Sequence, residues 1–221
     1  MPELLAIIVP LSLAASISPT SYLLFFAILA GKENQLRNGL AFLVGGTAAY
    51  AGILAVVLAT LGSPEAPAAP SHASLHGAID FVLAAVALTL LVMILAKKGD
   101  SGPAKPKAQP AGLFAFVLSG ASMKLLSANT LPPFIGAVRE VAGASVSTAE
   151  RATAYGVTLL VTMLPLLLPY VLFLFNRERT LALLGPAGAF LEKNKKPILA
   201  TILGLVTLFL AYHGFVHLRA A

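Results

Sequence analysis

Two groups of polar residues and prolines interrupt stretches of the chain that are otherwise apolar. The first group is Ser18, Pro19, Thr20 and Ser21. The second group lies within 119–133 and contains Lys124, Ser127, Asn129, Thr130, Pro132 and Pro133. A proline inside a helix removes a backbone donor and frees carbonyls upstream, which then need hydroxyls, water or a substrate as partners. Paired helix breaks of this kind are typical of the substrate site of a transporter.

The hydroxyl groups at the breaks allow two interpretations. Each one alone is explained by a local role, in which it bonds to backbone groups that the prolines leave unpaired. The two groups together favour a cavity lined by polar side chains. In that case we expect the two breaks to face each other across the centre of the helix bundle.

Lys124 is a charged residue at a depth where charge is costly. It lies about 13 residues into its apolar stretch, or roughly 20 Å at 1.5 Å per residue, which is inside the hydrocarbon core of a bilayer. A lysine there costs about 3 kcal/mol, so we expect its side chain to point into the protein, toward an acid, freed carbonyls or water. Three roles remain open: contact with a substrate headgroup, titration during coupling, or a static lysine that snorkels or forms an ion pair.

Asp80 is the candidate partner of Lys124. It lies about one helical turn into the stretch 76–96, roughly 6 Å below the outer edge. The two depths differ by about 5 Å in a core of about 30 Å, so side chains could bridge them. Alternatively, Asp80 only stabilises the first turn of its own helix, where acidic residues are favourable.

The composition indicates a membrane protein. Of the 221 residues, 58% are hydrophobic and 11% are charged, and the mean hydropathy is +0.89. Soluble domains carry about 25% charged residues. Apolar stretches of spanning length occupy 3–30, 39–62, 76–96, 111–138, 152–175 and 197–218. The first and fourth contain the breaks, so we expect two broken or kinked helices among six.

The basic residues predict the topology. The predicted first, third and fifth loops carry 11 of the 15 Lys and Arg residues, and the predicted opposite side carries 3. By the positive-inside rule, both termini face the extracytoplasmic side. The segment 97–110 is a predicted cytoplasmic linker between a three-helix repeat, 1–96, and a second one, 111–221, of inverted orientation. The segment 180–192 is predicted to lie on the membrane surface as an amphipathic helix, and Gly39, Gly45, Gly46 and Gly52 are predicted to let helices approach closely.

Several kinds of chemistry are excluded or unsupported. The chain has no cysteine, which excludes disulfides, thiol catalysis and cysteine metal sites. Motifs for nucleotide binding, serine hydrolysis and zinc proteolysis do not occur. His213 and His217 are spaced for metal ligation, but no third ligand is evident. We therefore expect no enzymatic activity, no cofactor and no resident metal. The formal charge of +6 is accounted for by membrane topology, and we expect no nucleic-acid partner.

Short motifs carry a family resemblance. They are Ser18-Pro19 followed by the run from Arg37 to Gly45, the run from Ser122 to Leu126, and the run from Asn194 to Ala200 with His213-Gly214. On these residues the chain resembles the lysine-exporter superfamily, and within it the mycobacterial glycolipid- and sulfolipid-addressing proteins of the GAP or Sap type. It departs from the amino-acid exporters by lacking their Pro-Gly-Pro, and it has Ser-Met where the family tends to have Asn-Pro before the lysine.

The resemblance implies an all-α polytopic protein with six transmembrane helices in two inverted three-helix repeats. It further implies export or translocation of a lipid or cell-envelope glycolipid across the cytoplasmic membrane of a prokaryote. Two alternatives stay open: a proton- or potential-driven exporter of a small solute such as an amino acid or cation, and a non-transporting accessory subunit of envelope machinery. The expected partners are the lipid bilayer and a lipid or small-molecule cargo, and a homodimer is also open.

Overall fold

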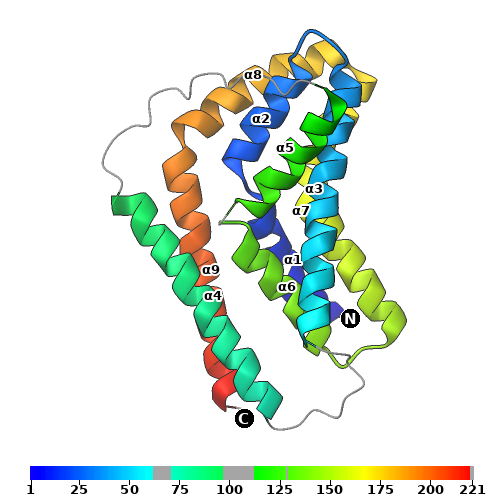
Figure 1. Ribbon diagram of the computed structural model, residues 1–221. Coiled ribbons are helices and arrows are strands. Elements are labelled where there is room, and N and C mark those ends of the chain that lie inside the picture. Colours follow the sequence, from blue (N-terminus) through cyan, green and yellow to red (C-terminus); the bar gives the residue numbers. More distant parts are fainter. Residues whose placement is uncertain (62–70, 97–111, 128, 220–221) are drawn as a thin grey trace.

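The regular structure of the described chain is entirely α-helical (Figure 1). The computed structural model describes residues 1–61, 71–96, 112–127 and 129–219, without the side chains of 61, 71–80, 213–214 and 217–219. The helices are α1 (Pro2–Ser16), α2 (Pro19–Leu29), α3 (Gln35–Leu61), α4 (Ser71–Ala96), α5 (Leu113–Leu125), α6 (Leu131–Gly143), α7 (Thr148–Phe175), α8 (Arg177–Lys193) and α9 (Lys195–Arg219). The predicted all-α class is confirmed for this part of the chain. The loop residues of 62–70 and the linker 97–110 lie outside it.

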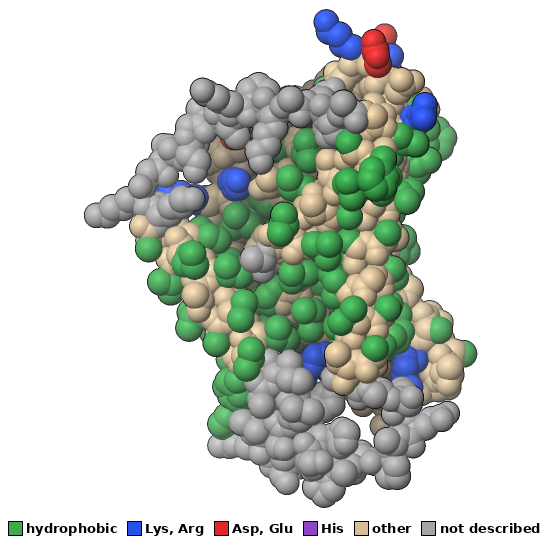
Figure 2. All heavy atoms as spheres, viewed as in Figure 1, with side chains coloured by type: hydrophobic (Ala, Val, Ile, Leu, Met, Phe, Trp, Pro, Cys, Tyr) green, Lys and Arg blue, Asp and Glu red, His purple; other side chains and the backbone are tan. Residues whose placement is uncertain are grey.

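Several helices are suited to a membrane. Within the described residues, Gln35–Thr60, Thr148–Phe175 and Lys195–Tyr212 are long and apolar enough to cross one. The bent pair of α1 and α2 would be a fourth span, and Phe81–Ala96 and Leu113–Leu125 are shorter apolar helices. Large apolar side chains cover much of the outer surface (Figure 2), and Phe114, Leu208 and Phe175 are 72%, 70% and 84% exposed. Such a surface is costly in water, so this is a membrane protein.

The helices form a bundle with a helical pair beside it. Helices α1, α2, α3, α5, α6 and α7 make up the bundle, and α4 packs along α9 at its flank (Figure 1). Across the bundle, α3 packs on α5, and α1 packs on both α6 and α7. Helix α1 begins and α9 ends toward the same end of the molecule (Figure 1). The packing of α1 on α6 brings the junction of α1 and α2 close to that of α5 and α6.

Helices α3 and α5 touch through glycines. A Cβ on Gly45 would lie 1.9 Å from the carbonyl oxygen of Val117, and one on Gly120 would lie 2.0 Å from that of Phe42. Only glycine fits at either position, so the two backbones are in direct contact. The predicted close approach is confirmed at Gly45, and at Gly39 and Gly46, where neighbours also lie within 4 Å of a Cβ. It is wrong at Gly52, which has open space around it.

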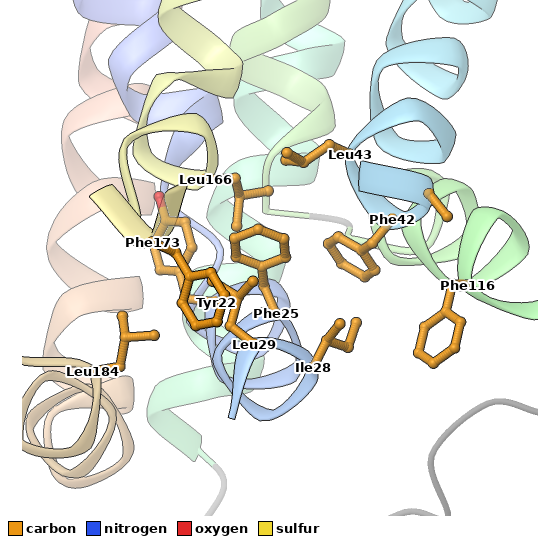
Figure 3. Close-up of a cluster of buried hydrophobic side chains, with 11 residues drawn as sticks. Tyr22, Phe25, Ile28, Leu29, Phe42, Leu43, Phe116, Leu166, Phe173 and Leu184 are labelled. Carbon is orange, nitrogen blue, oxygen red and sulfur yellow. The ribbon is translucent and has the colours of Figure 1, made fainter. Parts of the chain in front are cut away.

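An apolar cluster anchors α8 to the bundle (Figure 3). Phe25 and Leu29 of α2, Phe42 of α3 and Leu166 of α7 are almost completely buried there, and Leu184 of α8 packs at its edge. Helix α8 begins at the Asn176 cap, whose side chain accepts a hydrogen bond from the backbone N–H of Arg179 at 3.0 Å. The predicted amphipathic segment 180–192 is thus part of a helix that covers the ends of α2 and α7.

One predicted boundary is wrong. The sequence placed Arg139 and Glu140 in a loop after a span that ended at 138. Helix α6 instead continues to Gly143, and Arg139 is only 4% exposed. The helix that follows, α7, begins at Thr148, and the side chains of its N-cap residue Ser147 and of Glu150 form a capping box. A hydropathy window ends a span at the first charge, but backbone hydrogen bonding and a buried apolar face carry the helix one turn further.

Candidate functional site

The first break lies at the junction of α1 and α2. Helix α1 ends at Ser16, Ile17 and Ser18 are extended, and Pro19 starts α2. A proline is well accommodated at the first position of a helix because no backbone N–H is needed there. The axes of the two helices differ by 61°. The predicted interruption at Ser18–Ser21 is therefore present, with Ser18 as the N-cap residue of α2.

The second break separates α5 from α6. Helix α5 ends at Leu125, and α6 starts at Leu131 with Pro132 and Pro133 in its first turn. The hydroxyl of Ser127 donates to the carbonyl of Met123, and that of Thr130 donates to the carbonyl of Ser127 at 3.0 Å. These local bonds satisfy carbonyls that the missing helical turn leaves free, which is the local role considered for them above.

The two breaks contact each other directly. The side-chain amide of Asn129 donates to the carbonyl of Ile17 at 3.0 Å, across 112 residues of sequence. The hydroxyls of Ser18 and Ser127 lie 3.4 Å apart, and that of Ser18 is also 2.8 Å from that of Ser21. The predicted juxtaposition of the breaks is confirmed. Asn129 supplies the hydrogen bond that fixes it.

Side chains from several helices satisfy the carbonyls at the end of α1. The hydroxyl of Tyr22 on α2 donates to Ser16 at 2.6 Å, and that of Tyr50 on α3 donates to Ala15 at 3.3 Å. The hydroxyl of Thr162 on α7 lies 3.4 Å from the carbonyl of Ser12. Each of these carbonyls therefore has a side-chain partner from another helix of the protein.

A cavity of about 260 Å³ lies beside the breaks. Its polar lining consists of Ser18, Thr20, Ser122, Ser127 and Asn129. Its apolar lining consists of Pro19, Leu90, Ile94, Met123, Leu126, Leu199 and Leu203, from both breaks and from α4 and α9. Leu126 is 81% exposed and Thr20 is exposed, so the cavity reaches the surface of the molecule. It is an amphipathic recess between the bundle and the α4–α9 pair.

Some of the predicted site residues line the cavity and others do not. Ser18, Pro19, Thr20, Ser127 and Asn129 line the cavity. Four others are buried behind the breaks and do not line it: Ser21, Thr130, Pro132 and Pro133. Asp80 lies in α4, but its side chain is outside the described residues.

The sequence analysis missed about half of the lining. Ser122, Met123 and Leu126 share one face of α5 and its continuation with Ser127, so helical spacing could have identified them. The residues from α4 and α9 carry no such signal. They are ordinary apolar residues of those helices, and only the tertiary packing of the pair brings them to the breaks.

Lys124 points into the interior, on the side of α5 that faces α3. Its side chain is completely buried, and its stem passes over Gly46, where a Cβ would lie 3.5 Å from Lys124 Cγ. Its Nζ lies 5.5 Å from the centroid of the Tyr50 ring. No hydrogen-bond partner for Nζ occurs among the described residues, and Lys124 does not line the cavity. The expected interior direction is confirmed, with an aromatic ring in place of an acid.

The described side chains contain no group of three residues that could hold a metal ion. The side chains of His213 and His217 lie outside this set. The chemistry available at the breaks is therefore hydrogen bonding by hydroxyl and amide groups beside an apolar wall.

Comparison with known proteins gives one match. A family model described as "Sap, sulfolipid-1-addressing protein" matches residues 8–216. The matched region includes both breaks, Lys124 and every residue that lines the cavity. No curated protein and no solved structure matches the chain.

Proposed function

Because the chain belongs to the family of sulfolipid-1-addressing proteins, we propose that it is a transporter that moves a lipid, such as a cell-envelope glycolipid, across the cytoplasmic membrane. The description of the family concerns a lipid, and the protein has the apolar surface of a membrane protein. The proposal assigns the cargo path to the cavity beside the two breaks.

The amphipathic lining of the cavity is the observation that carries this proposal. Hydroxyl and amide groups on the breaks suit the polar headgroup of a lipid, and the leucines and isoleucine of α4 and α9 suit its chain. None of the described residues that line the cavity is charged, so headgroup recognition by them would rest on hydrogen bonds. A small hydrophilic solute would gain little from the apolar wall.

The position and size of the cavity fit a lipid that enters from the side. At 1.5 Å per residue, α1 is about 22 Å long and α2 about 16 Å, so the break lies near the middle of their combined path. Its exposed rim residues, Thr20 and Leu126, would then meet the hydrocarbon core. A volume of about 260 Å³ corresponds to roughly nine waters at about 30 Å³ each. It would hold one part of a lipid while the rest stays in the bilayer.

An arrangement of six spans in two inverted repeats, as in the lysine-exporter superfamily, is part of the proposal. Under such a repeat, α1 would correspond to α5, α3 to α7, and α4 to α9. The packing of α1 on α7 would then correspond to that of α3 on α5, and the α4–α9 pair would lie on the two-fold axis. This pattern of contacts supports the repeat, and the repeat would give the two alternating states that transport needs.

A second candidate is an exporter of a small solute that is driven by protons or membrane potential. The completely buried Lys124 favours it, because a charge inside a membrane protein often belongs to an ion or proton pathway. The two candidates differ in their cargo and can be separated by one reconstitution experiment.

The experiment compares two tryptophan variants in α9. Leu199 lines the cavity and is half-buried, whereas Leu208 points outward and is 70% exposed. Protein reconstituted into liposomes that contain a fluorescent glycosyl diacylglycerol is assayed for leaflet exchange by chemical quenching of the outer leaflet. We expect exchange by the wild type, a loss of at least about tenfold in Leu199→Trp, and wild-type exchange in Leu208→Trp.

Either of two results would overturn the proposal. One is the absence of leaflet exchange for this glycolipid with wild-type protein that is folded and incorporated into the liposomes. The other is equal exchange by both variants. Efflux of trapped radiolabelled lysine from the same liposomes, without lipid exchange, would establish the second candidate instead. Since the wild-type chain has no tryptophan, the fluorescence of each introduced residue also verifies incorporation and folding.

A further inference from the structure

Lys124 has no part in the cavity that the proposed function uses. The cavity is lined by Ser122, Met123, Leu126 and Ser127, which are one to three positions from Lys124 in sequence. Lys124 projects from the opposite side of the same turn, toward Gly46 and Tyr50 of α3. In this conformation it cannot touch a cargo molecule held among the lining residues. Its role must lie elsewhere.

Among the described side chains, none on the helices that pack against α5 neutralises a positive charge on Lys124. Helix α5 packs mainly on α3, and also on α2. The titratable side chains of these helices are Arg37 and Tyr50 on α3 and Tyr22 on α2, and neither helix contains an acid. Arg37 is 13 residues before Tyr50, or about 20 Å along α3, and the hydroxyl of Tyr22 is bonded to Ser16.

The ring of Tyr50 is therefore the contact that Lys124 Nζ makes among the described residues. An ammonium group has three hydrogens to donate, and here none of them finds an acceptor. A ring face attracts a cation but does not replace its lost hydration. The geometry suits a neutral amine.

Polar groups connect this position with the cavity. The hydroxyl of Tyr50 donates to the carbonyl of Ala15 at the end of α1. Two residues further along the chain, the carbonyl of Ile17 accepts from the side-chain amide of Asn129, which lines the cavity. Polar groups thus extend from the open recess to the ring on which Lys124 lies. Water that enters when the second break widens would reach the amine along this route.

We propose that Lys124 binds and releases one proton during the conformational cycle, and so makes the arrangement of the two breaks depend on pH. In the conformation described here the side chain is a neutral amine over Tyr50. When the second break opens, the nitrogen lone pair takes a proton from hydronium, which leaves water, and the ammonium is then hydrated. On closure the proton returns to water. The role in transport rests on the proposed function, whereas the proton uptake itself does not.

The first test measures the protonation state of Lys124 directly. Protein labelled with ¹⁵N at the lysine side chains is purified in detergent micelles, and the Lys124 signal is identified by its absence in Lys124→Met. We expect this signal at the chemical shift of a neutral amine at neutral pH, with the remaining lysines charged. A Lys124 signal at the ammonium position under these conditions would overturn the proposal. If Lys124→Met does not fold, Lys124→Gln serves the same assignment.

The second test measures the coupling between Lys124 and the breaks. A single cysteine at Thr20, on the exposed rim of the cavity, carries a bimane fluorophore, and the chain has no other cysteine. We expect the fluorescence to change with pH between about pH 6 and about pH 10, a range below and around the ordinary pKa of a lysine. The change should be absent in Lys124→Gln. An identical pH response in the two proteins, or no response in the wild-type background, would refute the coupling.

Neither test requires a cargo. If the liposome experiment shows no lipid exchange, the protonation state found for Lys124 is unaffected. If Lys124 proves to be charged, the result of the lipid exchange experiment is equally unaffected. The two ideas are therefore tested separately.

Discussion

The contact between α3 and α5 predicts that Gly120→Ala destabilises the protein, although alanine is the better helix former. The added Cβ would lie 2.0 Å from the carbonyl oxygen of Phe42 and 3.0 Å from the backbone nitrogen of Gly46. Ordinary contact needs roughly 3.5 Å, so α5 must move away from α3 by about 1.5 Å. Overpacking of this kind costs about 3 kcal/mol, and the gain in helix propensity returns about 1 kcal/mol. The expected net loss is about 2 kcal/mol.

Thermal unfolding of the purified protein in detergent measures this loss. For a chain of this length, about 2 kcal/mol corresponds to a melting temperature roughly 4–8 °C lower. Gly52→Ala is the matched control, because it adds the same methyl group to α3 at a position with nothing within 4 Å. We expect that variant to be unchanged or slightly more stable. An unchanged or raised melting temperature for Gly120→Ala would refute the backbone contact.

Two further predictions concern the breaks and the topology. Asn129→Leu should destabilise the protein by about 1–3 kcal/mol, because it removes the donor to the carbonyl of Ile17. The control Ser122→Ala removes only a bond within α5 and should cost about 1 kcal/mol or less. Chemical unfolding in detergent measures both losses, and equal losses would show that the bond between the breaks is unimportant. A reporter fused after Ala221 should be extracytoplasmic, as the basic residues predict, and cytoplasmic activity of that fusion would reverse the orientation.

The breaks were predictable because their causes are local. Pro19, Pro132 and Pro133 cannot sit inside a helix without freeing backbone groups, and the neighbouring hydroxyls can satisfy those groups. That Asn129 would reach Ile17, and not a backbone group of its own segment, was not evident from the sequence. Which carbonyl an amide finds depends on how two distant segments pack, and their relative position has no local signature.

The burial of Lys124 was also predictable, but its direction was not. The cost of charge in a hydrocarbon core requires an interior position and says nothing about which side of the helix faces the interior. The small residues Gly46 and Gly120 decide this, because they bring α3 close enough for Tyr50 to cover the amine. The glycine face of α3 was identified from the sequence, whereas its partner on α5 was not.

The last turn of α1 is a junction whose bonds lead to most of the bundle. Its carbonyls, with that of Ile17, accept hydrogen bonds from α2, α3 and the second break, and its Ser12 carbonyl lies within reach of Thr162 on α7. A small displacement of α1 would strain all of these bonds together, so they hold α1 in one position relative to α2, α3 and the second break. By contrast, Ala14 and Ile17 at the end of α1 pack against the apolar cluster of α4 and α9. Apolar contacts have no preferred direction and permit sliding. The end of α1 is thus held by directional hydrogen bonds on the side of the bundle and by non-directional apolar contacts on the side of α4 and α9.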